Sequence, residues 1–166
     1  IYQLQVPTDS ASQLDKGLQI LENWAHKVSL EDEEIDKERG VIVEEWRLGQ
    51  GAGQRMLDKQ LPIMFQGSQY AVRLPRGSMD VIKNADYETI RKFYRDWYRP
   101  DLMAVIAVGD FDPVDIETKM KSLFGAIPKR AEVRERAVYH VPGHTETLFA
   151  LASDKEATRS SLNVLF

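Results

Sequence analysis

The sequence contains no cysteine among its 166 residues. Disulfide bonds, thiolate metal sites and a cysteine nucleophile are therefore excluded. The lack of thiols does not identify the redox compartment, because such proteins occur in oxidising and reducing spaces alike. An excess of positive charge is also missing, since 22 Lys and Arg stand against 26 Asp and Glu and give a net charge of −4. No basic surface therefore indicates a nucleic-acid partner.

Long hydrophobic runs are absent too. The longest, residues 102–108, has the length of a strand and falls far short of the roughly 20 residues of a membrane-spanning helix. Hydrophobic residues make up 43% and charged residues 29%, which is typical of a globular protein. The chain starts at Ile1 rather than Met and ends at Phe166 in an apolar run. We therefore expect a piece of a longer protein, in which a signal peptide could lie outside the chain.

Helical periodicity is the strongest local pattern. Leu14, Leu18 and Leu21 recur at the spacing of one helix face. In residues 86–98, Asp86 is expected to cap a helix whose buried side carries Ile90, Phe93, Tyr94 and Trp97. Residues 67–85 are expected to be mostly loop, with a turn at Gly77. The predicted helices are residues 8–28, 29–50, 54–65, 86–98 and 113–124.

Other segments have the patterns of strands. Residues 1–7 alternate polar and apolar side chains, which predicts a half-buried strand, and 102–108 predict a strand covered on both faces. Residues 144–154 and 160–166 predict two more strands, after a charged linker at 129–137. This order of elements predicts an α+β or α/β fold, divided near residue 130.

The three histidines are His26, His140 and His144. His26 lies near the end of a predicted helix, where a positive side chain is favoured locally. His140 and His144 flank a Pro-Gly pair that breaks any helical pairing of their side chains. None of them lies in a His-x-x-Glu-His motif, so the histidines alone do not predict a zinc site.

Glu38, Ile42 and Glu45 fall at i, i+4 and i+7 in the segment DKERGVIVEEWR and share one stripe of a helix. The two glutamates lie two turns apart, about 10 Å along the axis, so both cannot easily bind one metal directly. One could be a ligand and the other its support. The alternative is an ordinary solvated face, on which these carboxylates pair with Arg39, Arg47 or water.

The stretches ERGVIVEE, YRPDLMAVIAVGDFD and FGAIP resemble the insulinase/pitrilysin family of zinc metallopeptidases, the inverzincins, in the order found in that family. The resemblance implies that Glu45 is the zinc-binding glutamate and that Glu38 is the supporting carboxylate. It also implies that the His-x-x-Glu-His segment, with the other ligands and the base, would precede Ile1. The parent protein would then be a zinc-dependent endopeptidase that hydrolyses peptides or unfolded proteins.

The resemblance carries expectations about the whole chain. It implies an α+β fold with a mostly antiparallel sheet packed by helices, as in the LuxS and processing-peptidase-like metallopeptidase domain. Residues 1–130 would be the back part of the catalytic-type domain, and 131–166 a linker and the first strands of a following peptidase-like domain without metal. Zn²⁺ would be bound in the intact parent, and the chain alone would bind none and be inactive.

The expected partners are peptide substrates, the missing His-x-x-Glu-His segment and the following domain. A bacterial periplasmic or cell-envelope location fits the resemblance. A different function, a non-catalytic scaffold or partner subunit, stays open, although the retained Glu38 and Glu45 favour the enzyme. A third interpretation is an unrelated acidic domain in which these glutamates face only solvent.

Overall fold

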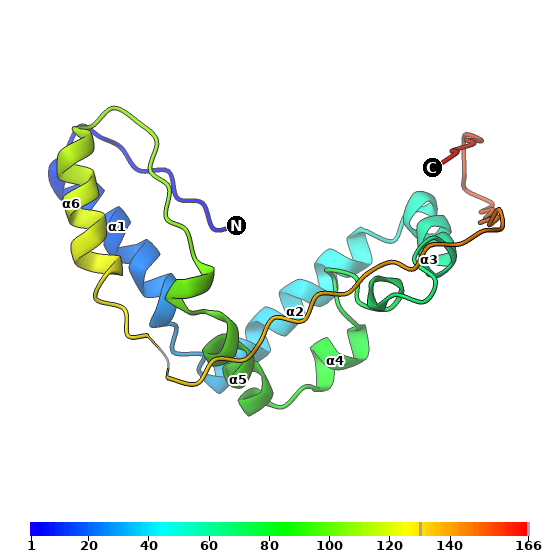
Figure 1. The fold of residues 1–166 in the computed structure, drawn as a ribbon, viewed down its shortest axis with the longest axis horizontal. Helices are drawn as coiled ribbons and strands as arrows, with labels where there is room; N and C mark the ends of the chain where they lie inside the picture. Colours follow the sequence, from blue (N-terminus) through cyan, green and yellow to red (C-terminus); the bar gives the residue numbers. More distant parts are fainter. Residues whose placement is uncertain (130, 166) are drawn as a thin grey trace. The chain divides into compact units, whose positions relative to one another are not determined.

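The computed structural model describes residues 1–129 and 131–165, and this part of the chain is helical without any strand. Arg130 and Phe166, which end the two predicted domain segments, lie outside the described residues. In chain order (Figure 1) the elements are α1 (Ala11–His26), α2 (Asp32–Leu48), α3 (Ala52–Met64), the 3-10 helix η1 (Gln69–Ala71), α4 (Met79–Asn84), α5 (Tyr87–Trp97), the 3-10 helix η2 (Pro100–Leu102) and α6 (Pro113–Phe124).

The chain divides into two compact units, each made of two stretches of sequence. Unit 1 comprises residues 1–32 and 86–135, and unit 2 comprises 33–85 and 136–166. Unit 1 thus contains α1, α5, η2 and α6, whereas unit 2 contains α3, η1, α4 and all of α2 after its first residue.

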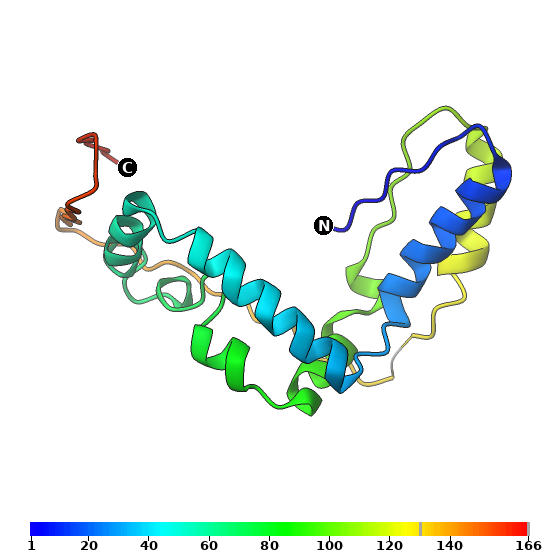
Figure 2. The same cartoon turned by 180° about the vertical axis from the view of Figure 1, so that it is seen from behind.

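In unit 1, α1 and α6 pack against each other, as Figures 1 and 2 show. Leu18 and Ile116 are almost fully buried, at 5% and 3% exposure. The extended residues before α1 also contact it, because a Cβ at Gly17 would lie only 2.6 Å from a methyl group of Val6. Burying a Leu or Ile side chain stabilises a fold by about 1.5–3 kcal/mol, so these contacts account for the core of this unit.

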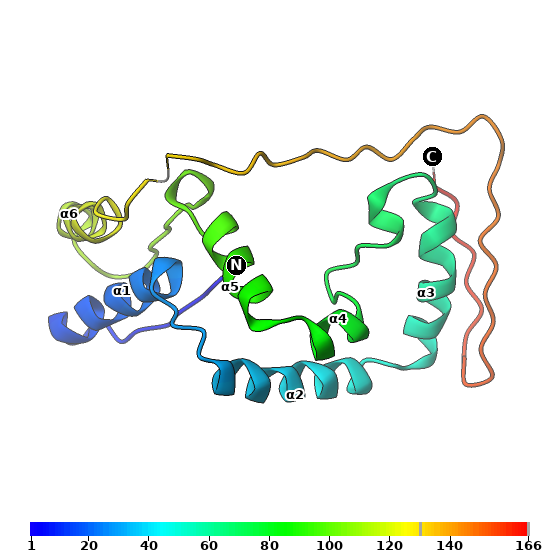
Figure 3. The same cartoon turned by 90° about the horizontal axis from the view of Figure 1, so that it is seen from below.

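In unit 2, the C-terminal segment runs along α3 (Figure 3). The side-chain amide of Gln60 donates a hydrogen bond to the carbonyl of Ala150 at 3.2 Å. The guanidinium of Arg55 donates two hydrogen bonds to the carboxylate of Asp154, each 2.7 Å long. Charge-assisted bidentate pairs are strong and geometrically specific, so Arg55 fixes the C-terminal segment to α3.

The helices begin where their capping residues predict. The carboxylate of Asp86 accepts a hydrogen bond from the Thr89 amide at 2.8 Å, which confirms the predicted cap of α5. The hydroxyl and amide of Thr89 also hold the pKa of Asp86 below its ordinary value. Pro113 starts α6 and Gly125 follows its last residue, as predicted. The helix boundaries agree with prediction because these determinants are local in sequence.

The prediction of an α+β fold with a mostly antiparallel sheet is wrong for the described residues, which contain no strand. Residues 1–7 and 103–108 form no ladder with a partner, and Leu102 is the last residue of η2. Val6 is half-buried and packs on α1. The alternating pattern therefore predicted a buried side of this segment correctly, but not that the segment joins a sheet. Ile106 and Val108 are 81% and 92% exposed, so the prediction that 102–108 is covered on both faces is also wrong.

The predicted strands at 144–154 and 160–166 are absent as well, within the part of them that the structure describes. An apolar, β-branched segment becomes a strand only where another segment pairs with its backbone hydrogen-bonding groups. The periodicity of one segment does not show whether such a partner exists.

Residues 67–85 are mostly loop, as predicted, apart from the short helices η1 and α4, and the predicted turn lies at Gly77. One smaller prediction fails. Phe93 was expected on the buried side of α5, yet its side chain is 60% exposed and its ring lies 6.5 Å from that of Trp97. The error arises because the burial of a short amphipathic helix depends on distant contacts that its own periodicity does not contain.

Candidate functional site

The candidate site residues lie on α2, in unit 2. The helix is continuous from Asp32 to Leu48, so Glu38 and Glu45 stand two turns apart on one stripe, about 10 Å along the axis. Ile42, between them on this stripe, is half-buried, whereas both glutamates are exposed. The structure therefore confirms that the two carboxylates lie on one helix.

Arg39, next to Glu38, has a structural role. Its guanidinium donates hydrogen bonds to the carbonyls of Ile82 and Ala85, at the C-terminal end of α4. It also forms an ion pair with Asp36 at 3.2 Å, and its side chain is only 15% exposed. The last carbonyls of a helix lack partners within the helix and are stabilised by a positive side chain. Arg39 thus holds α4 against α2.

The second arginine of the segment is also engaged. Arg47 forms an ion pair with Glu44, three residues earlier, with 2.8 Å between Nε and a carboxylate oxygen. Among the residues that the structure describes, none makes a hydrogen bond or ion pair with the side-chain carboxylate of Glu38 or Glu45. The two carboxylates are therefore available to a ligand, although Glu45 lines neither of the pockets found in unit 1.

The chain's own residues do not complete a zinc site. Within residues 1–129 and 131–165, no three His, Asp or Glu side chains form a group able to hold a metal. A catalytic zinc ion generally has three protein ligands and a water. Glu45 could therefore supply at most one ligand, and the other ligands would have to come from residues outside this chain.

The histidines lie in three different places. His26 is the last residue of α1, and its Nε2 contacts the carboxylate of Glu22, one turn earlier. His140 and His144 are exposed, and the Nδ1 of His144 lies 2.6 Å from the carbonyl of Glu146. The predicted local role of His26 at a helix end agrees with this geometry.

Sequence reasoning missed Glu22, the most buried acid of unit 1. It is 5% exposed and pairs with Lys27 at 2.8 Å and with His26. Burial alone would raise its pKa, but the hydrogen bonds from Lys27 and His26 outweigh burial and lower it. The i, i+4 spacing of Glu22 and His26 was the available signal.

No described helix combines the length and the hydrophobicity that crossing a membrane requires.

Comparison with known proteins identifies the family. The family described as the peptidase M16 inactive domain matches residues 84–165. A protein of Arabidopsis thaliana named "Zinc protease PQQL-like" is 35% identical over all of this chain, which covers 18% of that protein. This chain belongs to the M16, or insulinase, family. The family predicted from the three sequence stretches is thereby confirmed.

Two further comparisons agree with this family assignment. A protein of Haemophilus influenzae named "Probable zinc protease PqqL" is 29% identical over all of this chain, and the chain covers 18% of it. The crystal structure of the first half of the periplasmic protease PqqL from Escherichia coli superposes with a TM-score of 0.79 and 31% identity. That match covers 86% of this chain and 30% of the solved one. The chain thus spans less than a fifth of the curated relatives.

The predicted division near residue 130 stays a prediction. The family match begins at residue 84, inside the segment predicted as catalytic-type domain, and continues to residue 165. The two units of the structure are each discontinuous in sequence. These boundaries do not test whether a catalytic-type domain ends near residue 130.

Proposed function

We propose that this chain is part of a zinc-dependent endopeptidase, to which it contributes Glu45 as one zinc ligand and Glu38 as a supporting carboxylate. Similarity to proteins that are named zinc proteases, over the full length of this chain, supports the proposal. The substrates would be peptides or unfolded proteins. Similarity to the periplasmic PqqL of Escherichia coli favours a periplasmic location.

One observation carries the assignment of residues. In the segment Glu38–Arg47 both arginines are engaged with other groups, whereas the carboxylates of Glu38 and Glu45 are exposed and free of partners in the described structure. Arg39 and Arg47 pair instead with the acids three residues before them, since residues one or two positions apart on a helix do not face each other. An exposed carboxylate without a partner is available for metal coordination, and a second one on the same helix stripe suits an outer-shell role.

The chain by itself would have no peptidase activity. A single carboxylate cannot replace the three protein ligands of a catalytic zinc ion. The remaining ligands and the general base would come from the His-x-x-Glu-His segment predicted to precede Ile1. Exposure of Glu45 is compatible with this arrangement, because the groups that would cover it are not part of the chain.

The experiment compares Glu45→Gln with Glu44→Gln in the complete protein, measuring zinc content and chelator-sensitive peptide cleavage. Glu44 is a matched control, since it is the adjacent acid, is exposed and pairs with Arg47. Substitution of an outer-shell residue typically weakens metal binding about 10–100-fold. We therefore expect Glu38→Gln, at an outer-shell residue, to weaken zinc binding by about 10-fold. Glu45→Gln, which replaces a ligand, should weaken it by at least about 100-fold. Glu44→Gln should match the unsubstituted protein. Equal zinc content and activity in the Glu45 and Glu44 variants would refute the proposal.

A second function has one observation in its favour. The family description that matches residues 84–165 is that of an inactive domain, which suits a scaffold or partner subunit. The two functions differ in the behaviour of the complete protein. Tight zinc binding with chelator-sensitive cleavage favours the peptidase, whereas a protein that binds no zinc tightly at neutral pH would be the scaffold.

A further inference from the structure

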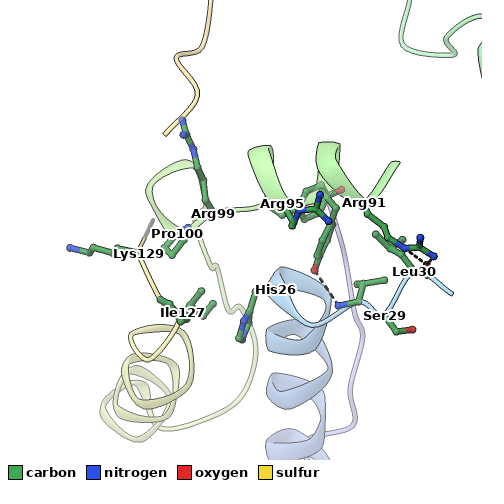
Figure 4. Close-up of a pocket in the computed structure, with 13 residues that line it drawn as sticks. His26, Ser29, Leu30, Arg91, Arg95, Arg99, Pro100, Ile127 and Lys129 are labelled. Carbon is green, nitrogen blue, oxygen red and sulfur yellow. Dashed lines mark hydrogen bonds between the residues drawn. The ribbon is translucent and has the colours of Figure 1, made fainter. Parts of the chain in front are cut away.

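Arginine side chains attach helices to backbone carbonyls in both units. In unit 1, Arg91 of α5 donates hydrogen bonds of 3.0 and 2.8 Å to the carbonyl of Leu30, in the loop between α1 and α2 (Figure 4). In unit 2, Arg39 of α2 donates hydrogen bonds to two carbonyls at the C-terminal end of α4. Arg39 directly follows Glu38, so its attachment bears on the candidate site.

The contacts of Arg39 restrict the rotation of α2 about its own axis. Its guanidinium donates from Nη1 to the carbonyl of Ile82 and from Nη2 to that of Ala85. Its Nε lies 3.2 Å from a carboxylate oxygen of Asp36, and the side chain is 15% exposed. The donors of a guanidinium form a rigid planar fork, so their acceptors fix its orientation. α4 lies beside α2 (Figures 1 and 3), and Arg39 therefore holds one helix in a set orientation to the other.

A second attachment of α2 lies seven residues later, at Trp46. In the orientation that satisfies its amide, Gln50 accepts two hydrogen bonds through its side-chain oxygen. One comes from Nε1 of Trp46 at 3.2 Å, and the other from Nη1 of Arg76 at 3.1 Å. Arg76 in turn pairs with Asp58 of α3 at 3.0 Å. Trp46 is thus connected, through a chain of side chains, to α3 and to the loop that precedes α4.

The two attachments and the two candidate acids have the same spacing. Arg39 directly follows Glu38, and Trp46 directly follows Glu45. Neighbouring residues are about 100° apart around a helix, so the attachments and the acids lie on separate stripes of α2. The attachment stripe contacts the rest of unit 2, whereas both acids are exposed. The helix is therefore held at two points beside the pair of acids.

We propose that Arg39 and Trp46 are positioning residues for the carboxylates of Glu38 and Glu45. By restricting the rotation of α2, they would keep Glu45 oriented toward the zinc ion and Glu38 beside it. Both would act through the glutamates and not on the metal itself. The inference rests on the proposed function, because it requires Glu45 to be a zinc ligand.

The test measures the zinc affinity of the complete protein by competition with a chelator, at a temperature where each variant is folded. We expect Arg39→Met to weaken zinc binding about tenfold, as groups that orient metal ligands typically do when they are replaced. Trp46→Phe keeps an aromatic ring but removes the Nε1–H donor. It should weaken zinc binding about threefold, because a neutral hydrogen bond is weaker than a charged one.

Arg47→Gln is the matched control on the same helix. Arg47 pairs with Glu44 and makes no hydrogen bond to α3 or α4 among the described contacts. This variant should bind zinc as tightly as the unsubstituted protein.

A double substitution separates positioning from a general loss of structure. If Arg39 acts through Glu45, Arg39→Met should weaken zinc binding no further in a Glu45→Gln background, since no ligand remains to be positioned. A general loss of structure would weaken binding by the same factor in both backgrounds, and that result would overturn the proposal. Because Arg39→Met could fail to fold, Trp46→Phe provides an independent variant, and its effect should likewise disappear when Glu45 is replaced.

Failure of this proposal and failure of the proposed function give different results. If Glu45→Gln weakens zinc binding but Arg39→Met and Trp46→Phe behave like Arg47→Gln, the positioning role is refuted and the zinc ligand stands. If Glu45→Gln itself leaves zinc binding unchanged, the proposed function is refuted, and the positioning role is refuted with it.

Discussion

Glu22 of unit 1 and the pair Glu38 and Glu45 of unit 2 lie in opposite environments. In unit 1, Glu22 is 5% exposed and is paired with both Lys27 and His26. In unit 2, Glu38 and Glu45 are exposed and have no partner in the described structure. All three are glutamates on long amphipathic helices, so residue type and helical spacing do not distinguish them.

The difference shows how to separate a structural acid from a candidate ligand. A buried carboxylate must be compensated by hydrogen bonds or positive charge, and Glu22 has both. An exposed carboxylate needs no compensation, so its lack of a partner costs nothing. Arg39 and Arg47 bind other groups, and their spacing of one and two residues from Glu38 and Glu45 places them on other faces of the helix.

The largest effect is expected from replacing Arg39. A loss of stability in α4 would show that unit 2 uses this arginine for structure and not to neutralise Glu38. Arg39→Met removes charged hydrogen bonds to the carbonyls of Ile82 and Ala85. We expect the free energy of opening of α4 to fall by about 3 kcal/mol, since a hydrogen bond from a charged group contributes about 1.5–3 kcal/mol. Hydrogen exchange of the α4 amides measures this opening.

Arg47→Gln is its matched control on the same helix. Arg47 also pairs with an acid three residues earlier but makes no hydrogen bond to α4 among the described contacts. Arg47→Gln should change the free energy of opening of α4 by no more than about 0.5 kcal/mol, as is usual for surface substitutions. Equal exchange in the two variants would contradict the role given to Arg39.

A smaller effect is expected from Glu22→Gln, which tests the buried side of the comparison. The substitution keeps the shape of the side chain and removes its charge, leaving Lys27 and His26 without their acid. Protection of the amides at the C-terminal end of α1 should fall by about 1–2 kcal/mol. Glu45→Gln, made in parallel, should leave the protection of α2 within about 0.5 kcal/mol. A loss of α2 protection as large as that in α1 would make Glu45 a structural residue.

The smallest effect is confined to the C-terminal segment at low pH. The hydrogen bonds from Arg55, and then the amide of Glu156, lower the pKa of Asp154 from an ordinary 3.8 to about 2. The contribution of this pair to stability is therefore complete above about pH 4 and is lost as the pH falls through about 2. The carbon-13 resonance of the Asp154 carboxyl should titrate near 2, and in Arg55→Gln its midpoint should rise but stay below 3.8, because the amide of Glu156 still donates its hydrogen bond. An unchanged midpoint in that variant would show that Arg55 does not cause the shift.

The parts of the fold that are local in sequence were predictable. Asp86 caps α5 because its carboxylate reaches an amide three residues away, and Pro113 starts α6 because its own ring fixes the backbone. The predicted strands failed because a strand requires a partner that lies elsewhere. Residues 102–108 have the composition of a buried strand, yet Val108 is 92% exposed.

The candidate site was predictable for a different reason. Glu38 and Glu45 were found through spacing on one helix together with a family resemblance, and each of these is visible in the sequence. The contact of Arg39 with Ile82 and Ala85 joins residues more than forty positions apart, and no periodicity reports it.

The most direct measurement is the structure of the complete protein with zinc bound, by crystallography or X-ray absorption. The account predicts a carboxylate oxygen of Glu45 about 2.0–2.2 Å from the metal, the ordinary zinc–oxygen distance, with Glu38 outside the first coordination shell. A zinc ion coordinated entirely by other residues, with the Glu45 carboxylate still in solvent, would contradict it.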